Sequence, residues 1–211
     1  MKVVEVARNL VVKAVHPIAR WLNKISKGKL HPDTVTIFGF LMHVPIAVLI
    51  ATGDWFWAGL LLVVFGLFDK LDGELARLQD RVTNTGGLLD AATDRMKEVL
   101  LYTGAAYFFA LSDHPATAAW AAAALGASIC VSYVKSKGET MVALMGTKHA
   151  YAKLNHVFRD GLVPFELRMF LLLVGLWTGQ LLIAVIVIAV LASFTAVQRL
   201  IQIREALSHE S

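Results

Sequence analysis

The residues most able to do chemistry are five aspartates that lie within 26 residues of one another. They directly follow an uncharged run, residues 55–68. Two pairs flank a single residue, Asp80: the pairs are Asp69 with Asp72 and Asp90 with Asp94. Carboxylates that border an apolar segment are costly to place there, so they usually serve a function. Their number and position predict a cation-binding site at the edge of an apolar region.

Helical geometry predicts that four of the aspartates form one site. At ~100° per residue, the first pair shares one helical face with Gly73 and Ala76. The second pair shares one face of a following helix with Gly86 and Gly87. A short turn at residues 79–85 makes the two helices antiparallel, and the small residues let backbones or a ligand come close. We assign Asp80 to the turn, as a solvated charge.

The chemistry of this site follows from its ligand type. Four carboxylates repel one another unless cations lie among them, and all-oxygen ligands suit Mg²⁺ or Mn²⁺. Two such ions ~4 Å apart form a clamp for phosphoryl transfer. No His or Cys lies within the stretch, which argues against zinc, and Arg77 offers a fork for a phosphate oxygen. A cation transporter is the rival interpretation, but its carboxylates lie near the bilayer midplane.

The elements that position these residues are predicted to be six transmembrane helices. Hydrophobic residues make up 57% of the 211 residues and charged residues 17%, which is more apolar than an ordinary soluble domain. Crossing a hydrocarbon core takes ~20 helical residues, and each uncharged run reaches this length with its flanks. The last run divides into two spans near residues 177–180. The runs are 34–53, 55–68, 99–112, 115–134 and 169–198.

Charge placement predicts the orientation. Three of the expected loops, at residues 52–55, 112–117 and 177–180, contain no Lys or Arg, and all twenty basic residues lie elsewhere. Because positively charged loops stay in the cytoplasm, both termini and the aspartate site are predicted to be cytoplasmic, in the cell membrane. The basic residues then border anionic lipid.

Residues 1–30 are predicted to form an amphipathic helix that lies in the membrane interface, where Pro17 breaks or kinks it. Residues 31–211 form the six-helix catalytic part of a single domain. The one cysteine, Cys130, lies in an apolar run and offers neither a disulfide nor a metal cluster. The charged N-terminal residues do not resemble a secretory signal. Pro32 with Asp33 or Thr34 marks a helix start, with one of the latter two as the cap.

The aspartate stretch resembles the signature of the CDP-alcohol phosphotransferases. Eight positions at fixed spacing carry the resemblance: Asp69, Asp72, Gly73, Ala76, Arg77, Gly86, Asp90 and Asp94. The resemblance implies that a CDP-linked lipid, usually CDP-diacylglycerol, gives its phosphatidyl group to an alcohol and that CMP leaves. It also implies two divalent ions, Mg²⁺ or Mn²⁺.

The resemblance further implies individual roles. Asp69, Asp72 and Asp90 hold the ions, and Asp94 both helps to hold one ion and takes the proton from the attacking hydroxyl. The residues that match positions contacting the CDP part are Asp33, Thr36, Gly73, Ala76, Arg77 and Thr83.

Within the family, the chain is most similar to the phosphatidylinositol phosphate synthases. The similarity lies in three pieces, residues 132–139, 166–176 and 197–200, which contain Lys135, Arg168 and Arg199 respectively. The resemblance implies that these three cations bind the phosphate of the acceptor. Each alone is also compatible with a basic side chain that extends to the membrane surface.

Two departures leave the acceptor open. The related synthases usually carry a further arginine shortly before the position of Arg168, where this chain has Phe165 or its neighbours. The connection at residues 140–165 also looks longer, and its Lys148, Lys153 and Arg159 are candidates to replace that charge. His43 is expected to be a packed residue rather than a catalyst.

The sequence therefore predicts an integral membrane enzyme of phospholipid biosynthesis that uses inositol phosphate as acceptor. Glycerol 3-phosphate as acceptor, a metal-binding transporter and an inactive scaffold are the alternatives. The expected partners are a CDP-lipid, an alcohol phosphate and the bilayer, not nucleic acid. The sequence leaves open the acyl chains and the association state, including a homodimer.

Overall fold

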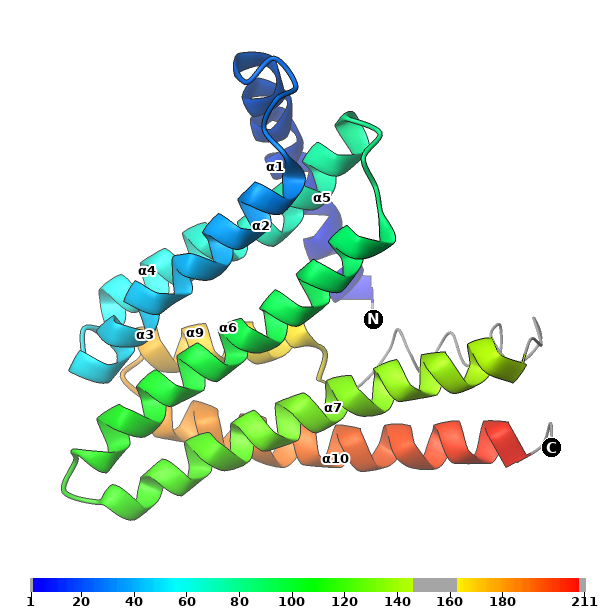
Figure 1. Cartoon of the computed structure of the whole chain (residues 1–211). Helices are drawn as coiled ribbons and strands as arrows, with labels where there is room; N and C mark the ends of the chain where they lie inside the picture. The colour runs from blue at the N-terminus through cyan, green and yellow to red at the C-terminus, as the bar shows by residue number, and fades with distance from the viewer. Residues whose placement is uncertain (1, 146–162, 209–211) are drawn as a thin grey trace. The chain divides into compact units, whose positions relative to one another are not determined.

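The structure, a computed structural model, describes residues 2–145 and 163–208. All regular elements in these ranges are helices, so the all-α prediction is confirmed for the described residues. The chain divides into two compact units, residues 1–104 and 105–211, which are treated separately below. The helices are α1 (Lys2–Ile25), α2 (Pro32–Leu41), α3 (His43–Thr52), α4 (Trp55–Gly66), α5 (Phe68–Leu78), α6 (Asn84–Ala110), α7 (Ala118–Met145), α9 (Phe165–Trp177) and α10 (Leu181–Ser208), with a short 3₁₀ turn η1 (Pro115–Thr117) (Figure 1).

The N-terminal helix α1 packs against α5 in the first unit. Val15 and Ala19, one helical turn apart, are buried with Leu71 and Leu75 of α5. A helix is therefore present at residues 2–25, and Pro17 lies inside it without ending it. Its place in a membrane interface stays a prediction. A second apolar stripe of α1 points outward, with exposed side chains at Ile18, Trp21 and Ile25. One part of the apolar side of α1 thus packs onto α5, and the other part is exposed.

One predicted span is built from the two shorter helices α2 and α3, and the span formed by α4 is followed directly by the charged helix α5. The backbone turns at Met42 between α2 and α3, and at Leu67 between α4 and α5. Pro45 contributes to the first break, because its ring lacks an N–H and crowds the preceding turn. The predicted cap at the start of α2 is wrong. His31 is the N-cap and accepts a bond from the Asp33 N–H, because Pro32 already occupies the first helical position.

A close contact between α3 and α6 depends on a glycine. A Cβ atom at Gly104 would lie 2.4 Å from the carbonyl oxygen of Ala47. No side chain larger than hydrogen fits there without a shift of the backbone. The contact fixes the far end of the α6 segment that carries Asp90 and Asp94.

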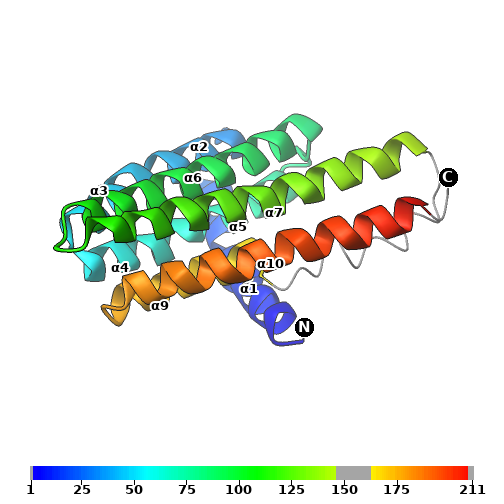
Figure 2. The same cartoon turned by 90° about the horizontal axis from the view of Figure 1, so that it is seen from below.

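In the second unit, α7 and α10 lie side by side in both views (Figure 1 and Figure 2). Small side chains make this possible: Ala127, Val131 and Ala192 form one buried cluster. The turn after α9 lies at residues 177–180, as predicted, with Gly179 at φ +70°. A Cβ at Gly175 would lie 2.4 Å from that of Ala184, so the start of α10 packs tightly on α9.

Within residues 2–145 and 163–208, three helical segments are long and apolar enough to cross a membrane: Pro32–Thr52, Pro115–Leu144 and Leu181–Ser208. The other predicted spans are shorter or more charged. Helices α4 and α9 have 12 and 13 residues, and α6 carries five charged side chains before its apolar end. The prediction of six spans is therefore met only in its coarser form, an all-helical chain with extended apolar segments.

Candidate active site

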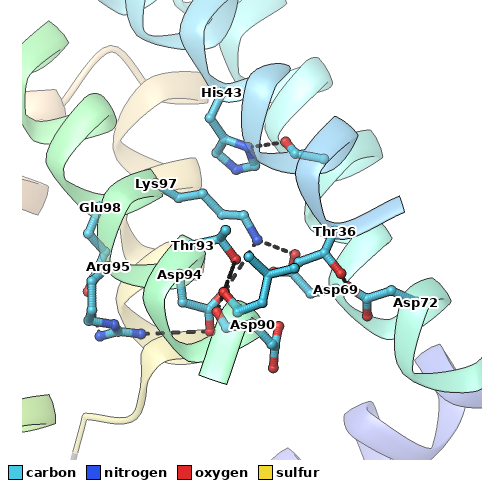
Figure 3. Close-up of polar contacts among 12 residues, drawn as sticks. Thr36, His43, Asp69, Asp72, Asp90, Thr93, Asp94, Arg95, Lys97 and Glu98 are labelled. Atoms are coloured by element: carbon cyan, nitrogen blue, oxygen red, sulfur yellow. Dashed lines mark hydrogen bonds and ion pairs between the residues drawn. The ribbon is translucent and has the colours of Figure 1, made fainter. Parts of the chain in front are cut away.

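The four predicted ligands lie in the first unit, on α5 and the N-terminal half of α6. The close-up in Figure 3 shows Asp69 and Asp72 from α5 near Asp90 and Asp94 from α6. Asp69 interacts electrostatically with Asp72, Asp90 and Asp94. The facing arrangement that helical spacing predicted is therefore present. Among the described residues, however, no three His, Cys, Asp or Glu side chains form a metal-ligand cluster as they stand.

A lysine lies among the aspartates. Lys97 of α6 is 1% exposed, and its Nζ donates hydrogen bonds to Asp69 Oδ1 and, at 3.3 Å, to Asp94 Oδ1. It lies three residues after Asp94 and so shares its helical face. The sequence analysis missed Lys97. Its available signal was the position of a lysine three residues after Asp94, on the face of the second aspartate pair and close to an uncharged run.

Asp72 is held by a residue from α2. Thr36 Oγ1 donates to Asp72 Oδ2 at 2.5 Å, and the Gly73 N–H contacts Asp72 Oδ1 at 2.6 Å. Both Thr36 and Asp72 are buried. The structure thus links Thr36, a predicted CDP contact, to a predicted metal ligand. The neighbouring His43 is buried and bonds the Gly39 carbonyl oxygen, as expected for a packed residue.

Burial raises the pKa of each of the four carboxyl groups, which lie outside the three long apolar segments. For Asp72, burial outweighs the bond from Thr36 and raises the pKa to about 6. For Asp94, burial and then the charge of Asp69 raise the pKa. For Asp90, burial and then the charge of Asp94 do the same. For Asp69, burial raises the pKa although Lys97 opposes it.

These residues fit divalent cations. Every donor atom is a carboxylate oxygen, as hard cations prefer. Asp90 Oδ1 is buried and has no hydrogen-bond partner within the described part of the chain. A buried charged oxygen without a partner is expensive, so it calls for a cation or water. After burial, the charges of neighbouring carboxylates also raise the pKa values of Asp72, Asp90 and Asp94, and a bound cation would relieve that repulsion.

The predicted CDP contacts around the start of α6 come together. Thr83 Oγ1 accepts the Gly86 N–H at 3.0 Å, as a helix cap does. A Cβ at Gly86 would lie 3.2 Å from Thr83 Oγ1 and 3.6 Å from Asp33 Oδ1. The small residue therefore keeps space between two predicted contact residues from different helices.

Arg77 and its surroundings add a feature that the sequence analysis missed. The Arg77 guanidinium, largely exposed, donates to Glu74 Oε1 one turn earlier on α5. Glu74 is buried, and its other oxygen lies 3.0 Å from His16 Nδ1 of α1. Gly73 and Ala76 lie on the same part of α5, half-buried. One carboxylate thus connects the N-terminal helix with a predicted CDP contact.

The predicted acceptor residues lie in the second unit. Arg168 and Arg199 are both buried and repel each other electrostatically. Arg168 donates to the Val163 carbonyl oxygen at 2.9 Å, and Arg199 to that of Val131 at 3.3 Å. Within the described residues Arg199 Nε has no hydrogen-bond partner.

Lys135 is half-buried and lies 3.8 Å from Glu139, whose charge also acts on Arg199. The charges of the two arginines therefore act on each other, and Glu139 interacts with both Lys135 and Arg199. Lys148, Lys153 and Arg159, the candidates for the missing charge, lie outside the described residues.

Comparison with known proteins gives the family. A sequence profile of the CDP-alcohol phosphatidyltransferases matches residues 29–198. The phosphatidylinositol phosphate synthase of Corynebacterium glutamicum is 33% identical over 197 residues, which cover 89% of this chain and 82% of that protein. The archaetidylinositol phosphate synthase of Methanothermobacter thermautotrophicus is 29% identical over 90% of this chain and 92% of its own length.

Other relatives match over a smaller part. The phosphatidylinositol phosphate synthase of Mycobacteroides abscessus is 32% identical over 63% of this chain, and the match spans 60% of that protein's length. For the corresponding protein of Cutibacterium acnes, which is 34% identical, the matched shares are 61% and 62%.

Solved structures show the same fold. Phosphatidylinositol phosphate synthase of Mycobacterium tuberculosis with CDP-DAG bound superposes with a TM-score of 0.75 at 28% identity, covering 90% of this chain and 94% of the other. Its complex with manganese and citrate gives a TM-score of 0.74 at 28% identity, covering 90% and 88%. The profile match over most of the chain, together with the aspartates facing one another across α5 and α6, shows that the chain belongs to the CDP-alcohol phosphatidyltransferase family.

Proposed function

We propose that this protein is an integral membrane enzyme that transfers a phosphatidyl group from CDP-diacylglycerol, or a similar CDP-lipid, to inositol phosphate. The observation that carries the proposal is the buried carboxylate set of α5 and α6 in a chain of this family. The names of the related synthases support the donor and the acceptor, and so does the crystal structure of one of them with CDP-DAG bound.

The reaction replaces one phosphorus–oxygen bond by another. The acceptor hydroxyl oxygen attacks the lipid-bearing phosphorus, the bond to the bridging oxygen breaks, and CMP leaves with the electron pair. Asp94 takes the hydroxyl proton, for which its raised pKa suits it. Asp69, Asp72, Asp90 and Asp94 would hold two Mg²⁺ or Mn²⁺ ions, which stabilise the negative charge that develops on the phosphates.

Other residues bind and orient the substrates. Arg77 binds a phosphate oxygen of the CDP part, and Asp33, Thr36, Gly73, Ala76 and Thr83 line its place. The acceptor phosphate binds at Lys135, Arg168 and Arg199, where an anion would relieve the repulsion between two buried guanidinium groups. Because free inositol carries no phosphate, this cluster favours a phosphorylated acceptor. Glycerol 3-phosphate is the second candidate for the same reason.

The proposal includes six spans, with residues 1–30 as an interfacial segment, residues 31–211 as the catalytic part, and both termini in the cytoplasm. The exposed apolar side of α10, with Ile183, Val190, Phe194 and Val197, is suited to lipid, as is the outer stripe of α1. The proposal also includes a homodimer in the cell membrane, and this part is based on the size of the chain alone.

The test is release of CMP from CDP-diacylglycerol by the purified protein. Inositol phosphate, glycerol 3-phosphate, free inositol and serine are offered separately, with Mg²⁺. We expect turnover with inositol phosphate ahead of the other three. Preference for free inositol or serine would overturn the acceptor assignment, and absence of CMP release with every acceptor would favour the transporter or the inactive scaffold.

A further inference from the structure

Lys97 is a buried cation inside the aspartate site, and the proposed reaction gives it no role. Its side chain is 1% exposed, and its ammonium contacts one carboxylate from α5 and one from α6 (Figure 3). An ammonium this deeply buried requires charged partners to offset its desolvation. Asp69 and Asp94 supply them, so two of the four proposed metal ligands already hold a positive charge.

The position of this ammonium matters as much as its charge. A divalent ion shared by α5 and α6 would use oxygens of Asp69 and Asp94, and Lys97 Nζ bonds Asp69 Oδ1 and Asp94 Oδ1. Asp90 presents the opposite situation, because its buried Oδ1 has no hydrogen-bond partner among the described residues. One part of the site therefore has a resident cation, whereas another part has an oxygen that lacks a partner.

The surroundings show which charges act on Lys97. Asp69 and Asp94 attract it directly, and its charge also acts on Asp90. From α3, the buried His43 interacts electrostatically with the Lys97 ammonium group. Arg95, the nearby cation on α6, pairs with Glu98 at 2.6 Å and lies 3.8 Å from Asp94. Lys97 bonds one carboxylate on α5 and one on α6, and so it bridges the two helices.

We propose that Lys97 is an internal counter-cation that competes with a divalent metal ion for Asp69 and Asp94. The proposal rests on the metal site of the proposed function. In the metal-free protein the ammonium holds α5 and α6 together across the carboxylates. When an ion binds, Lys97 must give up its bonds to Asp69 and Asp94. The lysine thereby stabilises the metal-free fold and weakens metal binding.

The opposite role is a fixed support that aligns the two carboxylates for the metal. The two roles predict opposite signs for the same substitution. Loss of a competitor strengthens metal binding, whereas loss of a support weakens it. Metal affinity, measured without substrates, therefore distinguishes them independently of catalysis.

The experiment uses the full-length protein purified in detergent. Mn²⁺ binding is measured by the EPR signal of free Mn²⁺ for the wild type, Lys97→Met and Lys97→Gln. We expect the Kd for Mn²⁺ to fall roughly tenfold or more in both variants, the effect of losing one charged hydrogen-bonding partner. The Tm of the metal-free variants should fall, and saturating Mn²⁺ should raise it by more than in the wild type.

Lys29→Met is the matched control, because it makes the same change in net charge at an exposed lysine in the loop before α2. Its Kd for Mn²⁺ should stay within about twofold of the wild type, since a distant exposed charge is screened. An equal gain in Lys29→Met would overturn the proposal, because net charge alone would then explain the effect.

Unchanged or weaker Mn²⁺ binding by the two Lys97 variants would overturn the proposal. Wild-type protein that binds no Mn²⁺ would instead overturn the metal site itself. If neither variant folds, a structure of the Mn²⁺-bound wild type decides. Lys97 Nζ should then lie beyond hydrogen-bonding distance of both carboxylates, and retention of both bonds would contradict the competition.

Discussion

At the scale of single residues, Asp94 combines two demands that conflict. It is proposed to hold a metal and to accept a proton, and it also contacts Lys97 and lies 3.8 Å from Arg95. Asp94→Asn keeps the shape of the side chain but removes its basicity. We expect kcat for CMP release to fall by a factor on the order of 10²–10⁴ while donor binding persists. Near-wild-type kcat in the purified variant would exclude Asp94 as the base.

Asp72 gives the site a dependence on pH. Burial raises its pKa to about 6, so below that pH its proton competes with the metal. We expect the affinity for Mn²⁺ to decrease as the pH falls through about 6. The stability of the metal-free protein depends on pH in the opposite direction. The folded state holds this proton more tightly than the unfolded state, so stability decreases as the pH rises from the ordinary value near 3.8 to about 6.

Unfolding by heat at pH 5 and pH 7, each with chelator and with Mn²⁺, measures both effects. The Tm increase on adding Mn²⁺ should be larger at pH 7 than at pH 5. Asp72→Asn should reduce this difference between the two pH values. An equal Mn²⁺ effect at both values would contradict the raised pKa.

At the scale of elements, α1 is connected through Glu74 to Arg77, a proposed contact of the CDP-lipid. His16 of α1 and Arg77 of α5 share this buried carboxylate. His16→Ala should weaken the docking of α1 by about 1 kcal/mol, as for a partly exposed hydrogen bond. Because Glu74 then loses one of its two partners, Arg77 should be less well positioned, and KM for the CDP-lipid should rise several-fold with little change in kcat.

His16→Gln is the control, because its amide can still donate to Glu74. It should retain most of the stability and the donor KM. Equal effects of the two substitutions on KM would indicate that His16 acts through packing rather than through this bond.

The faces, breaks and caps of the helices differ in how far sequence patterns predict them. The 3.6-residue period placed each aspartate pair on one face of its own helix, because neighbours at i, i+3 and i+4 share a face whatever the tertiary structure. The short turn between the two helices then indicated that these faces meet. The breaks at Met42 and Leu67 were missed, since both lie inside apolar runs without a helix-ending glycine at the turn itself. His31 was missed as a cap because histidine is not a preferred capping residue.

Long-range partners had no sequence signal. The bonds of Thr36 with Asp72, His16 with Glu74 and Lys97 with Asp69 join residues 28 to 58 positions apart. Periodicity describes one helix at a time, and pairing between helices depends on packing that it does not contain. Arg168 and Arg199 were identified as cations, but their burial and mutual repulsion required the structure.

At the scale of the whole molecule, the second unit carries the residues proposed to bind the acceptor, among them Arg168 and Arg199. Arg199→Ala removes a proposed contact with the acceptor phosphate but no group that takes part in the exchange of bonds. The KM for inositol phosphate should therefore rise about tenfold or more, while the KM for CDP-diacylglycerol stays within about twofold. An unchanged acceptor KM would indicate that Arg199 only anchors α10 to the Val131 carbonyl oxygen.

The contact of Gly104 with the Ala47 carbonyl has a mechanical consequence. Asp90 lies 14 residues from that contact along α6, or about 21 Å at 1.5 Å per residue. A tilt of α6 by about 5° around the contact would displace Asp90 by about 2 Å, which is comparable to a metal–oxygen bond length. A small rotation of α6 about Gly104 would therefore change the width of the carboxylate site without any change in the residues of the site itself.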